Sequence, residues 1–292
     1  MRALSILVDD WGFSHASLRG FYNQVQRRQP NQEADTLAFE CLLMAMHNVS
    51  ALQTARGLNE PYSLVRSAIV SWYYAIYYAS KSMIAAATGG DPQTHSKTGR
   101  VWQTDIAERN LAVTPFDYNF ADLTPANIKE TITRLRDGNP HDVNTTPANR
   151  EQALGAAISY LKGTAEYEKS RLEEEVKSSS EFKKRGFANF KTKAAIILRD
   201  EKLSKGQVNF VVQAFRYRGK ANYRDAIYLS YGTDNSETLS VFVEDLVNVA
   251  RAFTLMAAHY LPRRVPQRNW QDFVNDVRAN ARFPLPYDLS EI

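Results

Sequence analysis

Arg218 and Tyr223 are the pair of residues in this chain that points most directly to a ligand. They stand five positions apart in the segment FRYRGKANYRDAIYLSYG, residues 215–232, which holds four cationic side chains and four tyrosines. A guanidinium group binds phosphate oxygens through a fork of hydrogen bonds. A phenol with a pKa near 10 stays protonated at neutral pH, so it donates a hydrogen bond but is a poor base. The pair therefore predicts recognition of an anion. A purely structural role has equal weight: Arg218 would pair with acids of a neighbouring helix, and Tyr223 would pack in the core.

A strongly basic stretch precedes and overlaps this segment. Between residues 183 and 224 there are twelve Lys and Arg against Asp200 and Glu201, and aromatic side chains alternate with the cations. Cations for phosphates and rings for bases suit a strand of RNA. A solvated basic face over core phenylalanines, or an acidic protein partner, would explain the same composition. The expected ligand-binding residues are Arg218, Lys220, Asn222, Tyr223, Arg224, Lys183, Lys184, Arg185, Lys191 and Lys193.

A second Arg and His pair, Arg136 and His141, lies in the segment RDGNPH. It offers an alternative catalytic pair, but Gly138 and Pro140 indicate that a helix ends here, and this accounts for every residue except His141. His95 is expected to cap a helix start and to pack there; alternatively, Thr94, Ser96 and Lys97 could together hold a phosphate.

Other kinds of chemistry have no support in the sequence. The single cysteine, Cys41, excludes an internal disulfide and a cysteine metal cluster, and no histidines stand at metal-ligand spacing. There is no Walker-type loop, no GxGxxG and no Gly-x-Ser-x-Gly elbow. We therefore expect no metal and no cofactor.

Composition points to a folded protein of the cytoplasm. Of 292 residues, 44% are hydrophobic and 23% charged, which is ordinary for a globular chain. The start, MRALSILVDDWGF, becomes acidic too early for a signal peptide. The most apolar run, residues 68–80, is shorter than the roughly 20 residues that a membrane span needs. We expect no membrane association.

Helical periodicity dominates, so the sequence predicts an all-α fold. Apolar stripes predict long helices over 154–176 and 239–260, the latter ended by Pro262, and residues 61–87 are apolar almost all round, as in a central helix. Amphipathic helices are expected at 33–58 and 14–28. Thr124, Pro125 and Gly138 signal both ends of another helix. The tail, residues 282–292, is expected to lie extended on the surface.

Two segments in this order resemble the HEPN domain, a four-helix bundle. The first is SWYYAIYYASKSMIAAATGGDPQTHSKTGRVWQ, residues 71–103; the second is RGKANY, residues 218–223, followed by the striped helix 239–260. The resemblance implies a HEPN-like bundle over 61–262, a helical insertion at about 104–209, N-terminal helices in 1–60 packed on the bundle, and a C-terminal extension at 263–292.

The resemblance also carries an expectation about activity. Catalytic members cleave RNA without metal, using an Arg followed after four to six residues by a His; here Tyr223 stands in the place of that His. We therefore expect RNA or nucleotide binding without catalysis, by a homodimer, in a prokaryotic phage-defence or toxin–antitoxin setting. The alternatives are a metal-independent endoribonuclease using Arg218 with Tyr223, or Arg136 with His141, and a structural subunit that binds an acidic partner.

Overall fold

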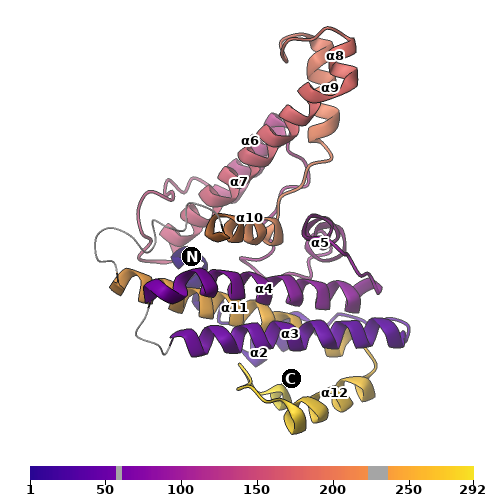
Figure 1. Cartoon of the computed structure of the whole chain (residues 1–292), viewed down its shortest axis with the longest axis vertical. Helices are drawn as coiled ribbons and strands as arrows, with labels where there is room; N and C mark the ends of the chain where they lie inside the picture. The colour runs from indigo at the N-terminus through magenta and orange to yellow at the C-terminus, as the bar shows by residue number, and fades with distance from the viewer. Residues whose placement is uncertain (57–60, 223–235) are drawn as a thin grey trace.

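Three long helices form the centre of a helical bundle in the computed structural model. The structure describes residues 1–56, 61–222 and 236–292, and for residues 61 and 220–222 it describes the backbone alone. The three helices are α3 (Gln32–Arg56), α4 (Pro61–Thr88) and α11 (Ser236–Arg264), and each packs on the other two. Figure 1 shows them running side by side. The buried side chains of α4 include Trp72, Tyr73 and Met83. The prediction of a central helix over 61–87 is confirmed. This helix is apolar almost all round because other helices of the same chain pack on it.

Shorter helices close the bundle. They are α1 (Arg2–Trp11), α2 (His15–Phe21), α5 (His95–Trp102), the π-helical turn η1 (Gln103–Ala107), α10 (Phe210–Asn222), α12 (Gln267–Asn280) and the 3₁₀ turn η3 (Leu289–Glu291). Helix α1 packs on α11, and α10 and α5 pack on α4. Ser14 caps α2 as its position suggests, but that helix ends at Phe21, earlier than the predicted Arg28.

An arm rises from this bundle (Figure 1). It consists of α6 (Pro125–Arg136), α7 (Arg150–Ser178), α8 (Ser180–Lys184) and α9 (Lys193–Leu203). Thr124, Pro125 and Gly138 bound α6 as predicted. The arm has its own apolar clusters, one around Leu161 and Leu203 and a second, smaller one around Phe182, both separate from the core of the bundle.

The described residues contain helices and a single isolated bridge, between Phe120 and Val208, so the predicted all-α fold is confirmed. None of the described helices combines the length and the apolar character that crossing a bilayer requires.

Two sequence expectations near the C-terminus need correction. Helix α11 continues through Pro262 to Arg264, because the side chain of Arg264 holds this last turn by donating hydrogen bonds to the carbonyls of Gln26 and Ala87. The tail is docked and not merely laid on the surface: Tyr287 and Leu289 are buried, and the Tyr287 hydroxyl donates to the carbonyl of Thr254.

Candidate functional site

Arg218 lies on α10, beneath the arm, where aromatic side chains hold its guanidinium group. The guanidinium carbon is 5.5 Å from the ring centre of Tyr73 and 5.9 Å from that of Tyr74. The Nε atom is buried and has no hydrogen-bond partner among the described residues. Of the other residues predicted in this segment, Lys220 and Asn222 belong to α10, and Tyr223 and Arg224 lie outside the described residues.

Two local features bring α5 against α10 and so position the site. Asn209, fully buried, accepts a hydrogen bond from the backbone N–H of Val212 at the start of α10 and donates to the carbonyl of Gly99 on α5. Gly99 faces Val212 so closely that an added Cβ would lie 2.8 Å from its Cγ2 atom. The missing side chain at position 99 therefore allows the close approach of the two helices.

His95 opens α5 beside Arg218. Thr94 caps the helix by accepting a hydrogen bond from the N–H of Lys97. The capping role expected for His95 therefore belongs to the preceding residue. The imidazole stacks on Phe215, with ring centres 5.0 Å apart, and its Nδ1 atom lies 2.5 Å from the hydroxyl of Tyr73. Desolvation, reinforced by the charge of Arg218, lowers the pKa of His95. The ring is therefore neutral at pH 7.

The contact between Tyr73 and His95 determines what the imidazole can offer. A phenol is a good donor and a weak acceptor, whereas an imidazole nitrogen with a free lone pair is a good acceptor. Burial raises the pKa of Tyr73, so its hydroxyl keeps its proton and we assign it as the donor to Nδ1. The ring proton of His95 then resides on Nε2. In this tautomer His95 presents a hydrogen-bond donor, and its basic nitrogen is already occupied.

His95 and Arg218 line a cleft at the junction of the arm and the bundle, with a volume of about 710 Å³. We call it the junction cleft. Its walls are α5, α10, the middle of α7 and the segment 205–207 that leads into α10. Its polar side chains are those of His95, Ser96, Arg100, Glu168, Arg171, Lys205, Gln207, Arg216 and Arg218.

The cations of the junction cleft fall into two groups. Arg171 is bound by Glu168 at 2.9 Å and by Glu175, and Lys205 lies 3.3 Å from Glu201. Arg100, Arg216 and Arg218, in contrast, have no carboxylate within ion-pair distance among the described residues. Three positive charges in one concave surface thus lack a counter-charge within the described part of the chain.

Arg216 is held in place by contacts that leave its charge uncompensated. Its Nη1 atom donates to the carbonyl of Gly163 at 3.1 Å, and its guanidinium carbon lies 4.1 Å from the ring centre of Tyr167. Both partners belong to α7, so Arg216 also connects the arm to α10. Planar guanidinium groups ordered in this way bind phosphate with less loss of side-chain entropy than mobile ones.

The remaining predicted cations lie elsewhere. Lys183, Lys184, Arg185, Lys191 and Lys193 are exposed around α8 and the start of α9, at the end of the arm away from α10 (Figure 1). The structure therefore does not bring them together with Arg218. Phe182 is buried at the arm tip and contacts the half-buried rings of Phe187 and Phe190. These rings form the small apolar cluster of the tip, away from the junction cleft.

Arg136 and His141 also lie away from the junction cleft. The guanidinium of Arg136 donates to the carbonyl of Asn139, within the turn that ends α6. The backbone of His141 packs on Gly155 of α7, where an added Cβ would lie 2.7 Å from the carbonyl oxygen of His141. Neither residue is part of the cleft wall, and the local contacts support the interpretation of this segment as a helix end.

Two histidines that look isolated in the sequence meet in the structure. Nε2 of His259 lies 3.1 Å from Nδ1 of His15, and Nε2 of His15 lies 3.3 Å from Glu291. His259 is 3% exposed, so it is buried more deeply than its place beside the apolar stripe suggests. Among the residues that the structure describes, no group of three or more His, Cys, Asp or Glu could hold a metal ion.

Sequence reasoning did not identify Arg100, Arg171, Lys205 or the role of Arg216. The sequence does contain one indication of Arg100. His95, Ser96, Gly99 and Arg100 stand at helical spacing, so they share one face of α5.

Comparisons with known proteins add no relative to this description. No family model matches the chain, and neither a search of curated proteins nor a search of solved structures found a similar protein.

Proposed function

We propose that this chain binds the phosphate groups of RNA or of a nucleotide in the junction cleft and does not catalyse a reaction there. One observation carries the proposal: Arg100, Arg216 and Arg218 line a single cleft without a carboxylate partner among the described residues. Concave surfaces with charges of one sign concentrate ligands of the opposite sign. Ordered guanidinium groups bind phosphate oxygens through paired, charge-assisted hydrogen bonds.

The neighbourhood of these arginines supports binding over catalysis. His95 offers an N–H to a phosphate oxygen, because its other nitrogen accepts from Tyr73. A general base for the 2′-hydroxyl of RNA would need a free basic nitrogen or a carboxylate within reach. The carboxylate in the cleft wall, Glu168, is bound to Arg171. Several expectations stay predictions from the sequence. They are that the domain is HEPN-like and binds RNA or a nucleotide, that the protein is a homodimer of the cytoplasm, and that it serves in a defence system.

Substitution of one arginine inside the junction cleft and of one outside it tests phosphate binding, because both substitutions remove the same charge. Arg218→Gln removes a cleft guanidinium, and Arg268→Gln removes an exposed one on α12 whose nearest carboxylate, Asp272, lies 3.9 Å away. We expect Arg218→Gln to weaken binding of a labelled single-stranded RNA or mononucleotide about tenfold, as the loss of a charged hydrogen bond implies. Arg268→Gln should bind like the wild type. Fluorescence anisotropy measures both.

Salt dependence gives a second criterion. Binding through phosphates releases counterions, so the affinity of the wild type for RNA should fall several-fold or more between about 50 and 200 mM salt. No binding of RNA or nucleotide at the lower salt, or an equal loss in Arg218→Gln and Arg268→Gln, would refute the proposal.

The same samples test for catalysis. RNA incubated with the protein in EDTA should be recovered intact. Cleavage that survives EDTA but is lost in both Arg218→Ala and Tyr223→Phe would instead establish the endoribonuclease alternative.

A further inference from the structure

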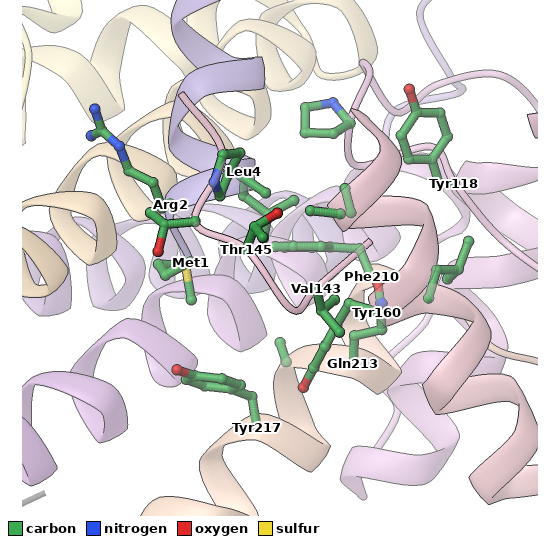
Figure 2. Close-up of a pocket in the computed structure, with 18 of the residues that line it drawn as sticks. Met1, Arg2, Leu4, Tyr118, Val143, Thr145, Tyr160, Phe210, Gln213 and Tyr217 are labelled. Carbon is green, nitrogen blue, oxygen red and sulfur yellow. The ribbon is translucent and has the colours of Figure 1, made fainter. Parts of the chain in front are cut away.

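A second pocket lies on the opposite side of α10. We call it the aromatic pocket; it has a volume of about 330 Å³ and is lined by Trp72 of α4, Tyr160 of α7, and Phe210, Gln213 and Tyr217 of α10. Figure 2 shows Tyr160, Phe210, Gln213 and Tyr217 around it, with Leu4 of α1 and Val143 of the 143–147 segment. This size is at the lower end of the range of about 300–1,000 Å³ for small-molecule sites.

Aromatic rings form a continuous wall of the pocket. Trp72 meets Phe210 edge to face at 6.3 Å and Tyr217 at 5.8 Å between ring centres, and Tyr217 meets Tyr160 at 6.4 Å. Rings in such a wall favour a flat ligand, which contacts them by stacking or by its edges.

Two buried donors of this wall lack a protein acceptor. Trp72 is 2% exposed, and its Nε1 atom has no hydrogen-bond partner among the described residues. The hydroxyl of Tyr160 is in the same situation, and burial raises the pKa of Tyr160, which keeps its proton in place. Buried polar groups are nearly always paired, so each unpaired group needs an explanation. Neither atom is exposed at the surface of the pocket, so an acceptor from a ligand would reach them through a small shift of the two rings. Such an acceptor would provide the explanation.

The charge of the wall indicates a neutral ligand. Arg2 is the one lining residue with a charged side chain within the described ranges, and its guanidinium is bound to the buried carboxylate of Asp245 at 3.1 Å. Met1 also lines the pocket, and burial lowers the pKa of its α-amino group, against the opposing charge of Asp245. The side chains of the wall thus offer hydrogen-bond donors and apolar surface but no unpaired charge. A charged ligand would lose its hydration there without compensation.

We propose that the aromatic pocket binds a neutral, flat heteroaromatic molecule of about two fused rings, whose ring nitrogens or carbonyl oxygens accept hydrogen bonds from Trp72 and Tyr160. This site is distinct from the junction cleft. Phe210, Gln213, Ala214 and Tyr217, at helical spacing, face the pocket, whereas Val212, Phe215, Arg216 and Gly219 face the cleft. The inference therefore does not depend on phosphate binding.

A pair of probes of equal shape tests this proposal. Quinazoline has two ring nitrogens that accept hydrogen bonds, and naphthalene has the same two fused rings with no acceptor. We expect quinazoline to bind the wild-type protein at least about tenfold more tightly than naphthalene, since each hydrogen bond contributes roughly fivefold. Ligand-observed NMR titration measures both. Equal affinities, or no binding of quinazoline, would overturn the proposal.

Four conservative variants locate the site. Tyr160→Phe and Trp72→Phe each remove one donor of the pocket and keep a ring, and each should weaken quinazoline about fivefold with little effect on naphthalene. Tyr260→Phe and Trp102→Phe are the matched controls, because their buried O–H and N–H groups also lack a described partner but lie outside the pocket. The controls should bind quinazoline like the wild type.

Thermal unfolding completes the test. Without ligand, Tyr160→Phe should unfold at the same temperature as the wild type or higher, because an unpaired buried hydroxyl is removed. A variant that is stable yet binds quinazoline as well as the wild type would show that this hydroxyl does not contact the ligand. An equal loss of quinazoline binding in the controls would place the probe elsewhere in the protein. Either result would overturn the proposal.

Discussion

The hydroxyl of Tyr73 lies 2.5 Å from Nδ1 of His95, and the guanidinium of Arg218 lies over the ring of the same tyrosine. Tyr73 therefore links the two polar groups at the bundle side of the junction cleft. It orients the imidazole by a hydrogen bond and holds the guanidinium by its ring face. Because Tyr73 is buried and the half-buried side chains of His95 and Arg218 both contact it, a change in one should be detected at the others.

The charge of Arg218 should be measurable at His95. Desolvation and this charge lower the pKa of His95 below its ordinary value of about 6.5. Arg218→Gln removes the positive charge but not the desolvation, so the pKa of His95 should rise and remain below that value. An NMR titration of the imidazole resonances measures the change. Arg171→Gln, in the same cleft but bound by two glutamates, should leave the titration as in the wild type. An unchanged midpoint in Arg218→Gln would refute the coupling.

The arm tip should matter for long RNA and not for a nucleotide. Lys183 and Lys184 are exposed at the far end of the arm from α10 (Figure 1). If RNA bound in the junction cleft also reaches the tip, the double variant Lys183→Ala and Lys184→Ala should weaken a long RNA several-fold through lost phosphate contacts. A mononucleotide should bind as it does to the wild type.

This comparison separates two ligands that the cleft alone does not distinguish. Equal affinity of the double variant and the wild type for long RNA would confine recognition to the cleft and favour a nucleotide. Arg100→Gln, which removes a cleft cation without a carboxylate partner among the described residues, is the matched control, because it should weaken both ligands.

The distance between the arm tip and the junction cleft illustrates which features the sequence could predict and which it could not. Long apolar stripes predicted α7 and α11, because burial of one helix face leaves a periodic pattern, and a segment that is apolar almost all round predicted α4. Helices α1 and α12 were not predicted, since short helices docked by one face leave few periods to recognise. The basic stretch looked continuous in sequence. Helix α9 packs back along α7, so the two ends of that stretch lie far apart.

The junction cleft could be predicted only in part for a related reason. Arg218 was identified from its own segment. Arg100 and His95 reach it because Asn209 and Gly99 bring α5 against α10, a contact between segments more than 100 residues apart. Contacts of this kind depend on packing that a single sequence does not record.

Buried His259 should make stability depend on pH. Burial, then the charges of His15, Arg19 and Arg263, lowers the pKa of His259 to about 3. In the unfolded chain a histidine titrates near 6.5. Between these two values the unfolded state binds more protons, so the free energy of unfolding should fall as pH falls, by up to about 1.4 kcal/mol per pH unit.

The variant His259→Gln isolates this contribution. Urea unfolding between pH 7 and pH 4 should show a shallower loss of stability for His259→Gln than for the wild type. His47→Gln replaces an exposed histidine and should keep the slope of the wild type. Parallel curves for all three proteins would mean that His259 has the same pKa in the folded and the unfolded state.

Two glycines of α7 should respond in opposite directions to the same substitution. At Gly155 an added Cβ would lie 2.5 Å from the side chain of Asn139 and 2.7 Å from the backbone oxygen of His141. Neither contact can relax without moving the turn that follows α6, so Gly155→Ala should lower the free energy of unfolding by about 1–3 kcal/mol.

At Gly163 nothing lies within 4 Å of an added Cβ. Gly163→Ala should therefore raise the free energy of unfolding by roughly 0.5–1 kcal/mol, through helix propensity alone. Chemical denaturation measures both. If Gly155→Ala proved neutral, the turn at residues 137–141 would not be fixed on α7, and Arg136 and His141 would again be candidates for a mobile functional pair.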